Sequence, residues 1–160
     1  MLLLIHSIVG AAALLSLVYS ARRLHPLEAV LTFMFASSAV QNIEIILSSN
    51  MKLLKIPTEV NVYLTFHLDR IVVYPMGLFW LSFFLRHSRY SLVMKISIAV
   101  LGLFTLTAGQ YWENRLTVIT MQKWGIAYSL LEWGALLAVT VGFSLLIRKM
   151  LMKVKVNSSI

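Results

Sequence analysis

Hydrophobic residues fall into five long blocks along the chain, and short polar connections separate these blocks. The blocks cover residues 2–20, 27–48, 61–85, 93–110 and 125–147. Each has a length within the ~17–25 residues that an α-helix needs to cross the hydrocarbon core of a bilayer. The pattern therefore predicts an all-α membrane protein. We expect a five-transmembrane-helix bundle that forms a single integral membrane domain over residues 1–160, with no soluble domain.

The composition supports this prediction. Of the 160 residues, 59% are hydrophobic and only 12% are charged, whereas soluble domains carry ~25% charged residues. A soluble domain with so few charged residues could not cover its own surface, which excludes an ordinary cytosolic enzyme and a disordered region. The chain has no cysteine, so disulfides, thiol catalysis and cysteine-bound metals are excluded within it.

Basic residues outnumber acidic residues and concentrate at the ends of the predicted helices. The formal net charge is +8, from 14 Lys and Arg against 6 Asp and Glu. One side of the predicted membrane receives Arg22, Arg23, Arg86, Arg89, Lys95, Arg148, Lys149, Lys153 and Lys155, and the other side only Lys52, Lys55, Arg115 and Lys123. The side richer in basic residues is expected to be cytoplasmic, which places the N-terminus outside and the C-terminus inside. These residues are expected to contact anionic lipid at the inner face rather than nucleic acid.

Several polar residues interrupt the predicted spans, where an ionisable side chain costs at least ~2.5–3.5 kcal/mol. The candidate intramembrane polar cluster contains Gln41, Asn42 and Glu44 in the second span, His67, Asp69, Arg70 and Tyr74 in the third, and Glu132 in the fifth. Glu59 and Glu113 fall in the predicted connections instead. Counted from the span ends, Glu44, Asp69 and Glu132 lie at similar depths in the outer half of the bilayer.

The spacing of these residues also predicts which helix faces they share. Tyr63, His67, Arg70 and Tyr74 recur at helical intervals on one face of the third span, as do Gln41 and Glu44 on the second. We therefore expect Arg70 at the centre of the cluster, neutralised by Glu44, by Glu132 or by both. Asp69 is expected to point ~100° away, toward another partner.

This cluster has one structural and several functional interpretations. It is either a buried ion-pair network that fixes the register of the helices, or a functional site. The functional alternatives are a proton or ion relay, a pocket for an anionic headgroup or small solute, and a polar seat for a partner helix. The sequence contains no glycine-rich phosphate loop, no His-Glu-x-x-His and no Gly-x-Ser-x-Gly, and we expect no catalytic residues.

The leading functional hypothesis is a small multi-pass accessory, regulatory or structural subunit that acts through helix–helix contacts. The alternative is a small transporter or channel component that uses the intramembrane Glu, Asp and Arg residues as an ion or proton relay. The expected partners are the bilayer itself and either another membrane protein or further copies of the chain. A transporter should form a stable homo-oligomer, because five helices barely enclose a pathway.

Two sequence features bear on helix packing. Gly134, Ala138 and Gly142 recur every four residues in the fifth span, a pattern that allows helix backbones to approach closely. We expect this stripe to pack within the chain, with a homodimer interface as the alternative. Pro75 lies inside the third span, where it cannot donate a hydrogen bond to the carbonyl of Ile71. It should kink the helix, and the freed carbonyl needs another partner.

Two histidines raise the question of a cofactor. His6 and His67 both lie in the outer half of the predicted membrane, where ligation of a haem between two helices is conceivable. Such a site would need facing imidazole rings and a cavity, neither of which the sequence indicates. We therefore expect no cofactor and no metal, with His67 hydrogen-bonded within the polar cluster instead.

Two stretches of the chain resemble a family of small, uncharacterised five-helix membrane proteins from spore-forming Firmicutes. The first is His67-Leu68-Asp69-Arg70-Ile71-Val72-Val73-Tyr74-Pro75, and the second is Trp124-Gly125-Ile126-Ala127-Tyr128-Ser129, which Glu113 precedes. The resemblance implies a bacterial cytoplasmic membrane as the location. It implies no activity, since that family has no assigned function.

Overall fold

The computed structural model describes residues 1–20, 24–56, 58–122 and 124–157. Its helices are α1 (Leu2–Ser20), α2 (Pro26–Ile45), α3 (Val60–Leu68), α4 (Tyr74–Arg86), α5 (Leu92–Arg115) and α6 (Ile126–Asn157). Two π-helical turns, η1 (Ile46–Asn50) and η2 (Asp69–Val73), extend α2 and join α3 to α4, and the short strands are β1 (Leu54–Lys55) and β2 (Thr120–Met121). In the described residues, five helical runs are long and apolar enough to cross a membrane. The predicted all-α fold is confirmed to that extent.

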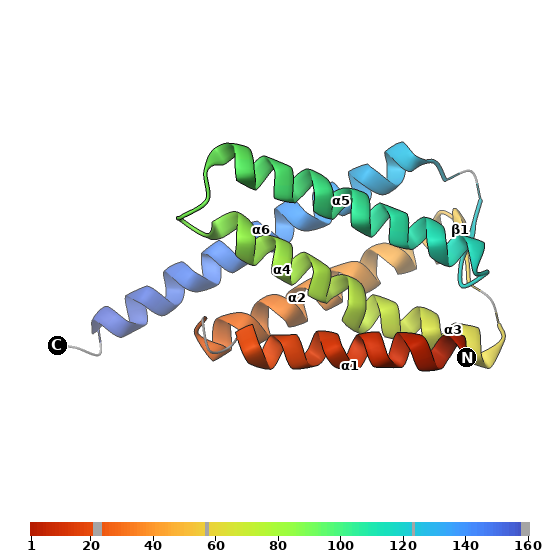
Figure 1. Ribbon diagram of the computed structural model, residues 1–160, viewed down its shortest axis with the longest axis horizontal. Coiled ribbons are helices and arrows are strands. Elements are labelled where there is room, and N and C mark those ends of the chain that lie inside the picture. The colour runs from red at the N-terminus through yellow and green to blue at the C-terminus, as the bar shows by residue number, and fades with distance from the viewer. Residues whose placement is uncertain (21–23, 57, 123, 158–160) are drawn as a thin grey trace.

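The third helical run is the centre of the bundle. Its α4 part packs against α2, α5 and α6, while its α3 and η2 parts pack against α1. α1 lies at the edge of the bundle, and the start of α1 and the end of α6 lie at opposite ends of the molecule (Figure 1). The main apolar core combines residues from α2, α4, α5 and α6: Ala36, Val40, Tyr74, Leu78, Leu106, Trp133, Leu136 and Leu137.

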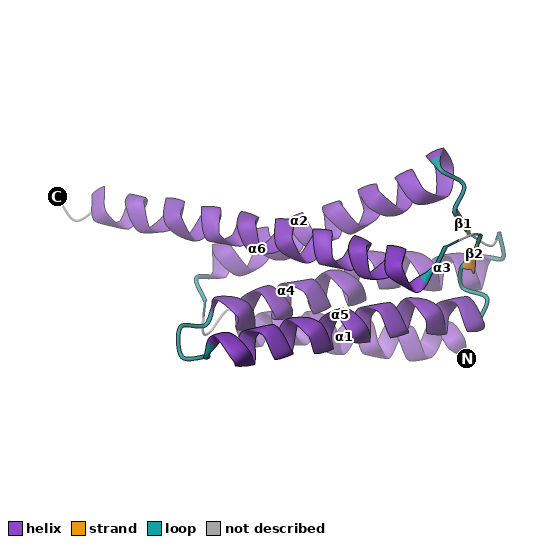
Figure 2. Cartoon of the chain, turned by 90° about the horizontal axis from the view of Figure 1, so that it is seen from above, coloured by secondary structure: helices purple, strands orange, loops and turns teal. Residues whose placement is uncertain are grey.

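Two helices extend beyond their predicted limits. The apolar block that ends at residue 110 predicted the end of the fourth span, but α5 continues to Arg115. Gln110 and Glu113 are buried at 0% and 3% exposure and lie one helical turn apart. Glu113 was expected in a loop, and this expectation is wrong. At the other end of the chain, α6 continues to Asn157 and projects past the rest of the bundle (Figure 2).

The connections at the α3 end of the bundle are tied together. Leu54 pairs with Met121 and Lys55 with Thr120 in an antiparallel ladder, and the Gln122 amide donates to the Leu53 carbonyl at 2.7 Å. We call this pairing, residues 53–55 with 120–122, the loop clasp. Beside it Val118 and Ile119 are fully buried and pack against Phe66 in α3. The loop clasp therefore covers this end of the bundle with apolar side chains.

Pro75 is accommodated by a wide turn and by a neighbouring helix. The π-helical turn Asp69–Val73 lies directly before the proline in the run from Val60 to Arg86. The Ile71 carbonyl, to which Pro75 cannot donate, accepts a hydrogen bond of 3.0 Å from the Ser37 hydroxyl of α2. The expected need for another partner is thus met by a side chain, because water is scarce at such a position.

The small-residue stripe of α6 points away from the bundle. A Cβ atom added at Gly134 or Gly142 would meet no described atom within 4 Å, and Ala138 is exposed. The expectation that these three residues pack within the chain is therefore wrong. α6 instead packs through its bulky side, where Trp133 is fully buried and Leu136 is 2% exposed.

Candidate functional site

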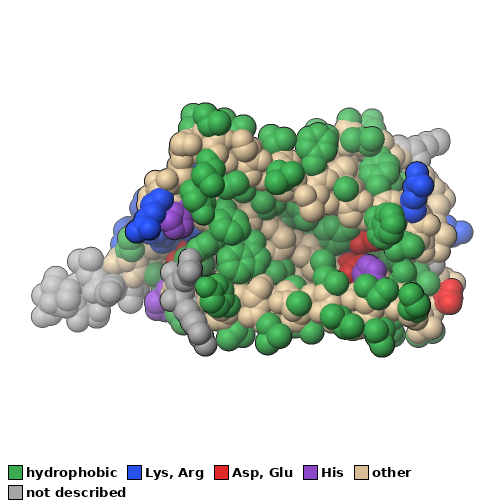
Figure 3. Space-filling model, viewed as in Figure 1, with side chains coloured by type: hydrophobic (Ala, Val, Ile, Leu, Met, Phe, Trp, Pro, Cys, Tyr) green, Lys and Arg blue, Asp and Glu red, His purple; other side chains and the backbone are tan. Residues whose placement is uncertain are grey.

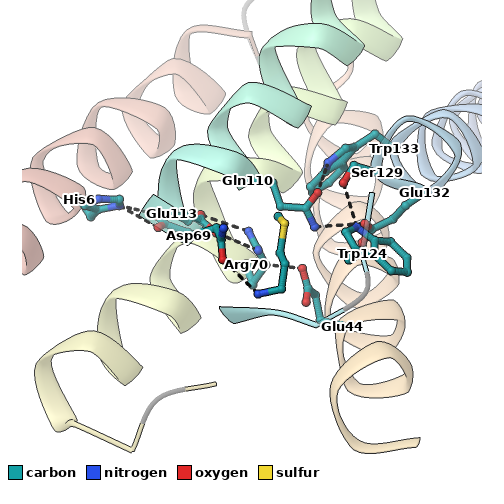
Figure 4. Close-up of polar contacts among 12 residues, drawn as sticks. His6, Glu44, Asp69, Arg70, Gln110, Glu113, Trp124, Ser129, Glu132 and Trp133 are labelled. Carbon is teal, nitrogen blue, oxygen red and sulfur yellow. Dashed lines mark hydrogen bonds and ion pairs between the residues drawn. The ribbon is translucent and has the colours of Figure 1, made fainter. Parts of the chain in front are cut away.

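Arg70 lies at the centre of a buried polar layer near the α3 end of the bundle. Its side chain is 1% exposed, and its Nε lies 2.5 Å from Glu44 Oε1 of α2. Its other nitrogens form a two-pronged contact with Glu113 of α5, with Nη1 donating to Oε1 at 3.2 Å and Nη2 to Oε2 at 2.9 Å (Figure 4). Two carboxylates from two helices therefore compensate one guanidinium, in the fork geometry that suits arginine.

Aromatic rings fill the remaining directions around the guanidinium. Its central carbon lies 4.4 Å from the ring centroid of Tyr74 and 5.1 Å from that of Phe66, within the range of cation–π attraction. The Tyr74 ring in turn stacks on Trp133 of α6 at 4.8 Å. An added Cβ at Gly109 would lie 3.0 Å from the Tyr74 hydroxyl, so the glycine permits this close approach.

Asp69 faces the opposite way from Arg70 and binds the edge helix. His6 Nδ1 of α1 lies 2.8 Å from Asp69 Oδ1 and 2.7 Å from Oδ2. Asp69 is 2% exposed, whereas the His6 side chain is 19% exposed. Histidine and acidic side chains are visible from the surface in a hollow between α1 and α5, near the α3 end (Figure 3). This part of the layer is therefore the part that reaches the surface.

Glu132 does not contact Arg70, contrary to one of the expected pairings. Its Oε2 accepts a hydrogen bond of 3.2 Å from Gln110 Nε2, and Gln110 Oε1 accepts one of 3.3 Å from Trp133 Nε1. The second carboxylate on Arg70 belongs to Glu113, which the longer α5 brings to this depth. Glu132 extends the layer to α6 through Gln110.

The structure separates three predicted members from the layer. Gln41 donates to the Ser37 carbonyl and hydroxyl, and Asn42 donates to those of Ser38, so both amides bond within α2. His67 packs against the rings of Tyr63 and Phe66 at 4.3 and 5.3 Å. Its buried Nε2 has no hydrogen-bond partner in the described part of the chain, so its expected hydrogen bonding to the cluster is wrong.

The histidines also differ in their surroundings. His6 contacts Asp69, while His67 lies against aromatic rings, so the two residues have different partners. Among the described residues, no group of three or more His, Cys, Asp or Glu side chains is arranged to hold a metal ion.

The polar layer consists of His6, Glu44, Asp69, Arg70, Gln110, Glu113 and Glu132. It draws at least one residue from each of the five helical runs. It contains four carboxyl groups, one guanidinium, one imidazole and one amide, and its hydrogen bonds and ion pairs link side chains from all five runs. A layer of this kind can fix the positions of five helices, and it can also hold protons near its exposed end.

Glu113, Gln110 and Ser37 were missed as functional candidates. The spacing of Gln110 and Glu113 places both on one helix face. This signal could have been recognised only if the fourth span had been predicted to continue past residue 110. Ser37 had a signal too, because it lies one turn before Gln41 on the predicted polar face. The role of His6 as the partner of Asp69 had no signal, since nothing in the sequence specifies which helix lies beside α1.

Comparisons of the chain with protein-family models, with curated proteins and with solved structures found no match. The function is therefore argued from the geometry of the chain itself.

Proposed function

We propose that this chain is a small multi-pass membrane subunit that acts through helix–helix contacts, with the outward face of α6 as the contact surface. The observation that carries the proposal is the outward direction of Gly134, Ala138 and Gly142. A Cβ at either glycine would meet no described atom within 4 Å. A helix that faced only lipid would gain nothing from small residues at this spacing, whereas a partner helix could approach closely.

The polar layer supports this proposal by giving the subunit a fixed shape. Arg70 is compensated by Glu44 and Glu113 and enclosed by two aromatic rings. Breaking one member of such a buried network leaves an uncompensated charge, so the helices have one favoured arrangement. A bundle held in this way presents the α6 face in a constant orientation.

The absence of cysteine makes this proposal testable with single-cysteine variants. Gly142→Cys in native membranes should cross-link on oxidation or with a short bis-maleimide. A product of twice the mass identifies a second copy, and a product of another mass identifies a different polypeptide. The matched control is Val139→Cys, because Val139 is 54% exposed on the same helix but points ~100° from the centre of the stripe.

The two positions must differ for the proposal to stand. Cross-linking at residue 142 but not at 139 is the expected result. Cross-linking that is equal at both positions, or absent at both, would contradict a contact surface centred on the stripe. A second variant, Ala138→Cys, places the cysteine elsewhere on the stripe. Adding Gly142→Ile to this variant should reduce the cross-linked product, because the bulky side chain separates the two backbones.

We also propose a location and an orientation for the subunit: a bacterial cytoplasmic membrane, with the N-terminus outside and the C-terminus inside. The proposal rests on the excess of basic residues on one side and is compatible with the start of α1 and the end of α6 lying at opposite ends of the bundle. A C-terminal green fluorescent protein fusion should fluoresce, and a C-terminal alkaline phosphatase fusion should be inactive. The reverse pair of results would overturn the orientation.

A proton relay is a second candidate, favoured by the partly exposed His6 beside Asp69. His6 is the more exposed member of this pair, and Asp69 is the sequence neighbour of Arg70. Proteoliposomes loaded with a pH-sensitive dye should then show proton flux under a potassium diffusion potential, and Asp69→Asn should abolish it. A parent protein without flux would reject the relay.

A further inference from the structure

A second polar site lies at the end of the bundle opposite the polar layer. A cavity of about 380 Å³ lies between the start of α2, the end of α4 and the late part of α6. Its polar lining comes from His25, Glu28, Arg86, His87, Ser88 and Arg148. Basic and histidine side chains gather at this end of the molecule, which is the left end in Figure 3. We call these residues with their cavity the Arg86 site.

Arg86 is buried in this site with one nitrogen left over. Its side chain is 5% exposed, and Nη1 lies 2.5 Å from Glu28 Oε1. Nη1 also donates to the Ser144 carbonyl at 3.5 Å, and Nε donates to the Ser82 carbonyl at 3.2 Å. Nη2 is buried without a hydrogen-bond partner among the residues that the structure describes. A buried guanidinium N–H without an acceptor is costly, so this group favours an acceptor supplied from the cavity.

Both histidines of the site present a donor. His25 Nδ1 accepts the Leu27 amide at 3.3 Å, and His87 Nδ1 accepts the Arg89 amide at 3.4 Å. A neutral imidazole whose Nδ1 accepts must carry its proton on Nε2. Each ring therefore has an Nε2–H group available for an acceptor. The assignment follows from the backbone contacts, which hold both rings in the same tautomer.

The charge of the site favours an anion. Two guanidinium groups, Arg86 and Arg148, face one carboxylate, Glu28. The cavity also adjoins the first turn of α2, which begins at Pro26 and has the partial positive charge of a helix N-terminus. Arg86 lies in the last turn of α4, where its positive charge offsets the partial negative charge of the helix C-terminus. The excess positive charge is thus local to the cavity.

We infer that the Arg86 site binds a phosphate group through Arg86, Arg148 and the two histidines. Two donors lie on helices, Arg86 at the end of α4 and Arg148 on α6, and the two histidines flank helices, His25 before α2 and His87 after α4. A tetrahedral phosphate has several strong acceptor oxygens that can meet such donors together. Basic cavities between membrane helices are the places where phospholipid headgroups bind. The inference does not depend on the proposed contact surface of α6.

The experiment compares two neighbouring charges on α6. The full chain, purified in discs of dioleoylphosphatidylcholine, is titrated by calorimetry with dihexanoylphosphatidic acid and, separately, with inorganic phosphate. Arg148→Gln removes a charge that lines the cavity, while Lys149→Gln removes an exposed charge from the next residue, which is not in the lining. Both side chains extend from the exposed side of the helix, so neither substitution threatens folding. Dihexanoylphosphatidylcholine is the zwitterionic control.

We expect saturable binding of at least one phosphate probe, weakened about tenfold by Arg148→Gln, as loss of a charge-assisted hydrogen bond implies. Lys149→Gln should change the affinity less than about twofold, because exposed charges contribute little. Binding of phosphatidic acid alone assigns the site to a lipid headgroup, and binding of both probes assigns it to phosphate itself. Equal losses for the two variants, or no saturable binding of either probe, would overturn the inference.

Discussion

Two buried arginines stand on the same helical run, and their surroundings differ. Arg70 meets two carboxylates and two aromatic rings. Arg86 meets one carboxylate and two backbone carbonyls, and its Nη2 has no partner in the described structure. Arg70 lies among close-packed side chains, whereas Arg86 borders a cavity. A fully enclosed arginine joins helices, while an under-coordinated arginine beside a cavity is suited to binding.

The difference follows from which helices supply acids. Glu44 and Glu113 come from α2 and α5, on two sides of the third run. At the other end Glu28 pairs with Arg86, and the other described side chains that line the cavity are basic or neutral. One helical run therefore contains an arginine paired with two carboxylates and, at its end, an arginine that in our inference binds a ligand.

The largest effect is expected from Arg70→Leu. It leaves Glu44 and Glu113 buried without their cation, and removing one partner of a buried pair typically costs ~3–5 kcal/mol. The unfolding free energy, measured by titration with sodium dodecyl sulfate in mixed micelles, should fall by this amount. The combined variant Arg70→Leu, Glu44→Leu and Glu113→Leu should recover much of the loss, because apolar replacement of a whole network can be nearly neutral.

Glu132→Leu is the matched control for this first prediction. Glu132 is a buried acid near the layer, but its described hydrogen bond is to Gln110. The control variant Arg70→Leu, Glu44→Leu and Glu132→Leu, which keeps Glu113, should not recover the lost stability. Equal recovery by the two combinations would mean that Glu113 is not the partner of Arg70.

A smaller effect is expected at Arg86. Two isosteric substitutions, Glu28→Gln beside Arg86 and Glu113→Gln beside Arg70, compare the two arginines directly. Glu28→Gln should cost ~1.5–3 kcal/mol, the value of a hydrogen bond to a charged group. Because the Arg86 site borders a cavity, added phosphatidic acid should recover part of this loss. It should recover none of the loss caused by Glu113→Gln, since Glu113 is 3% exposed in the packed layer.

Hydropathy predicts the five helices because a bilayer demands long apolar runs. The pairing of Arg70 with Glu44 was within reach of the sequence, because depth and helix face can both be counted. Glu113 was not, because the polar residues from Gln110 onward resemble the end of a span. In the structure the helix continues and turns Gln110 and Glu113 inward.

The π-helical turn explains a second discrepancy. Tyr63 and His67 were placed on the face of Arg70 by counting 3.6 residues per turn. The turn Asp69–Val73 is wider, so residues before and after it no longer keep the same phase. Tyr63, before the turn, is 46% exposed, while Tyr74, after it, is 5% exposed and lies against Arg70. Sequence periodicity contains no signal for a single wide turn other than the proline that follows it.

An effect of about 1 kcal/mol is expected from Ser37→Ala, which removes the hydrogen bond to the Ile71 carbonyl. Ile71 lies next to Arg70 in the wide turn Asp69–Val73. The loss of unfolding free energy therefore measures how much this hydrogen bond stabilises the turn that contains Arg70. Ser38→Ala is the matched control, because Ser38 is the next residue and is exposed. Equal losses of unfolding free energy would show that the Ile71 contact contributes nothing specific.

Gly142→Ala is expected to cause no loss of stability, the smallest destabilisation of the series. An added Cβ would meet no described atom within 4 Å, so it has no steric cost, and because alanine favours a helix over glycine, the unfolding free energy of the monomer should stay unchanged or rise by up to ~1 kcal/mol. This variant is a baseline for the comparison of the two arginines, because it alters neither. A large destabilisation in dilute detergent would show that α6 packs within the chain through this face.

The loop clasp has a consequence for the order in which the chain is assembled. Leu54 emerges from the ribosome long before Met121, its partner in the ladder. During this interval Arg70 is synthesised after Glu44 of α2, and Glu113 follows later with α5. Closure of the clasp then brings Val118 and Ile119 onto Phe66. The third helical run is thus synthesised when one of the two carboxylates that pair with Arg70 is present, while the second carboxylate and the apolar cover from Val118 and Ile119 are still to come.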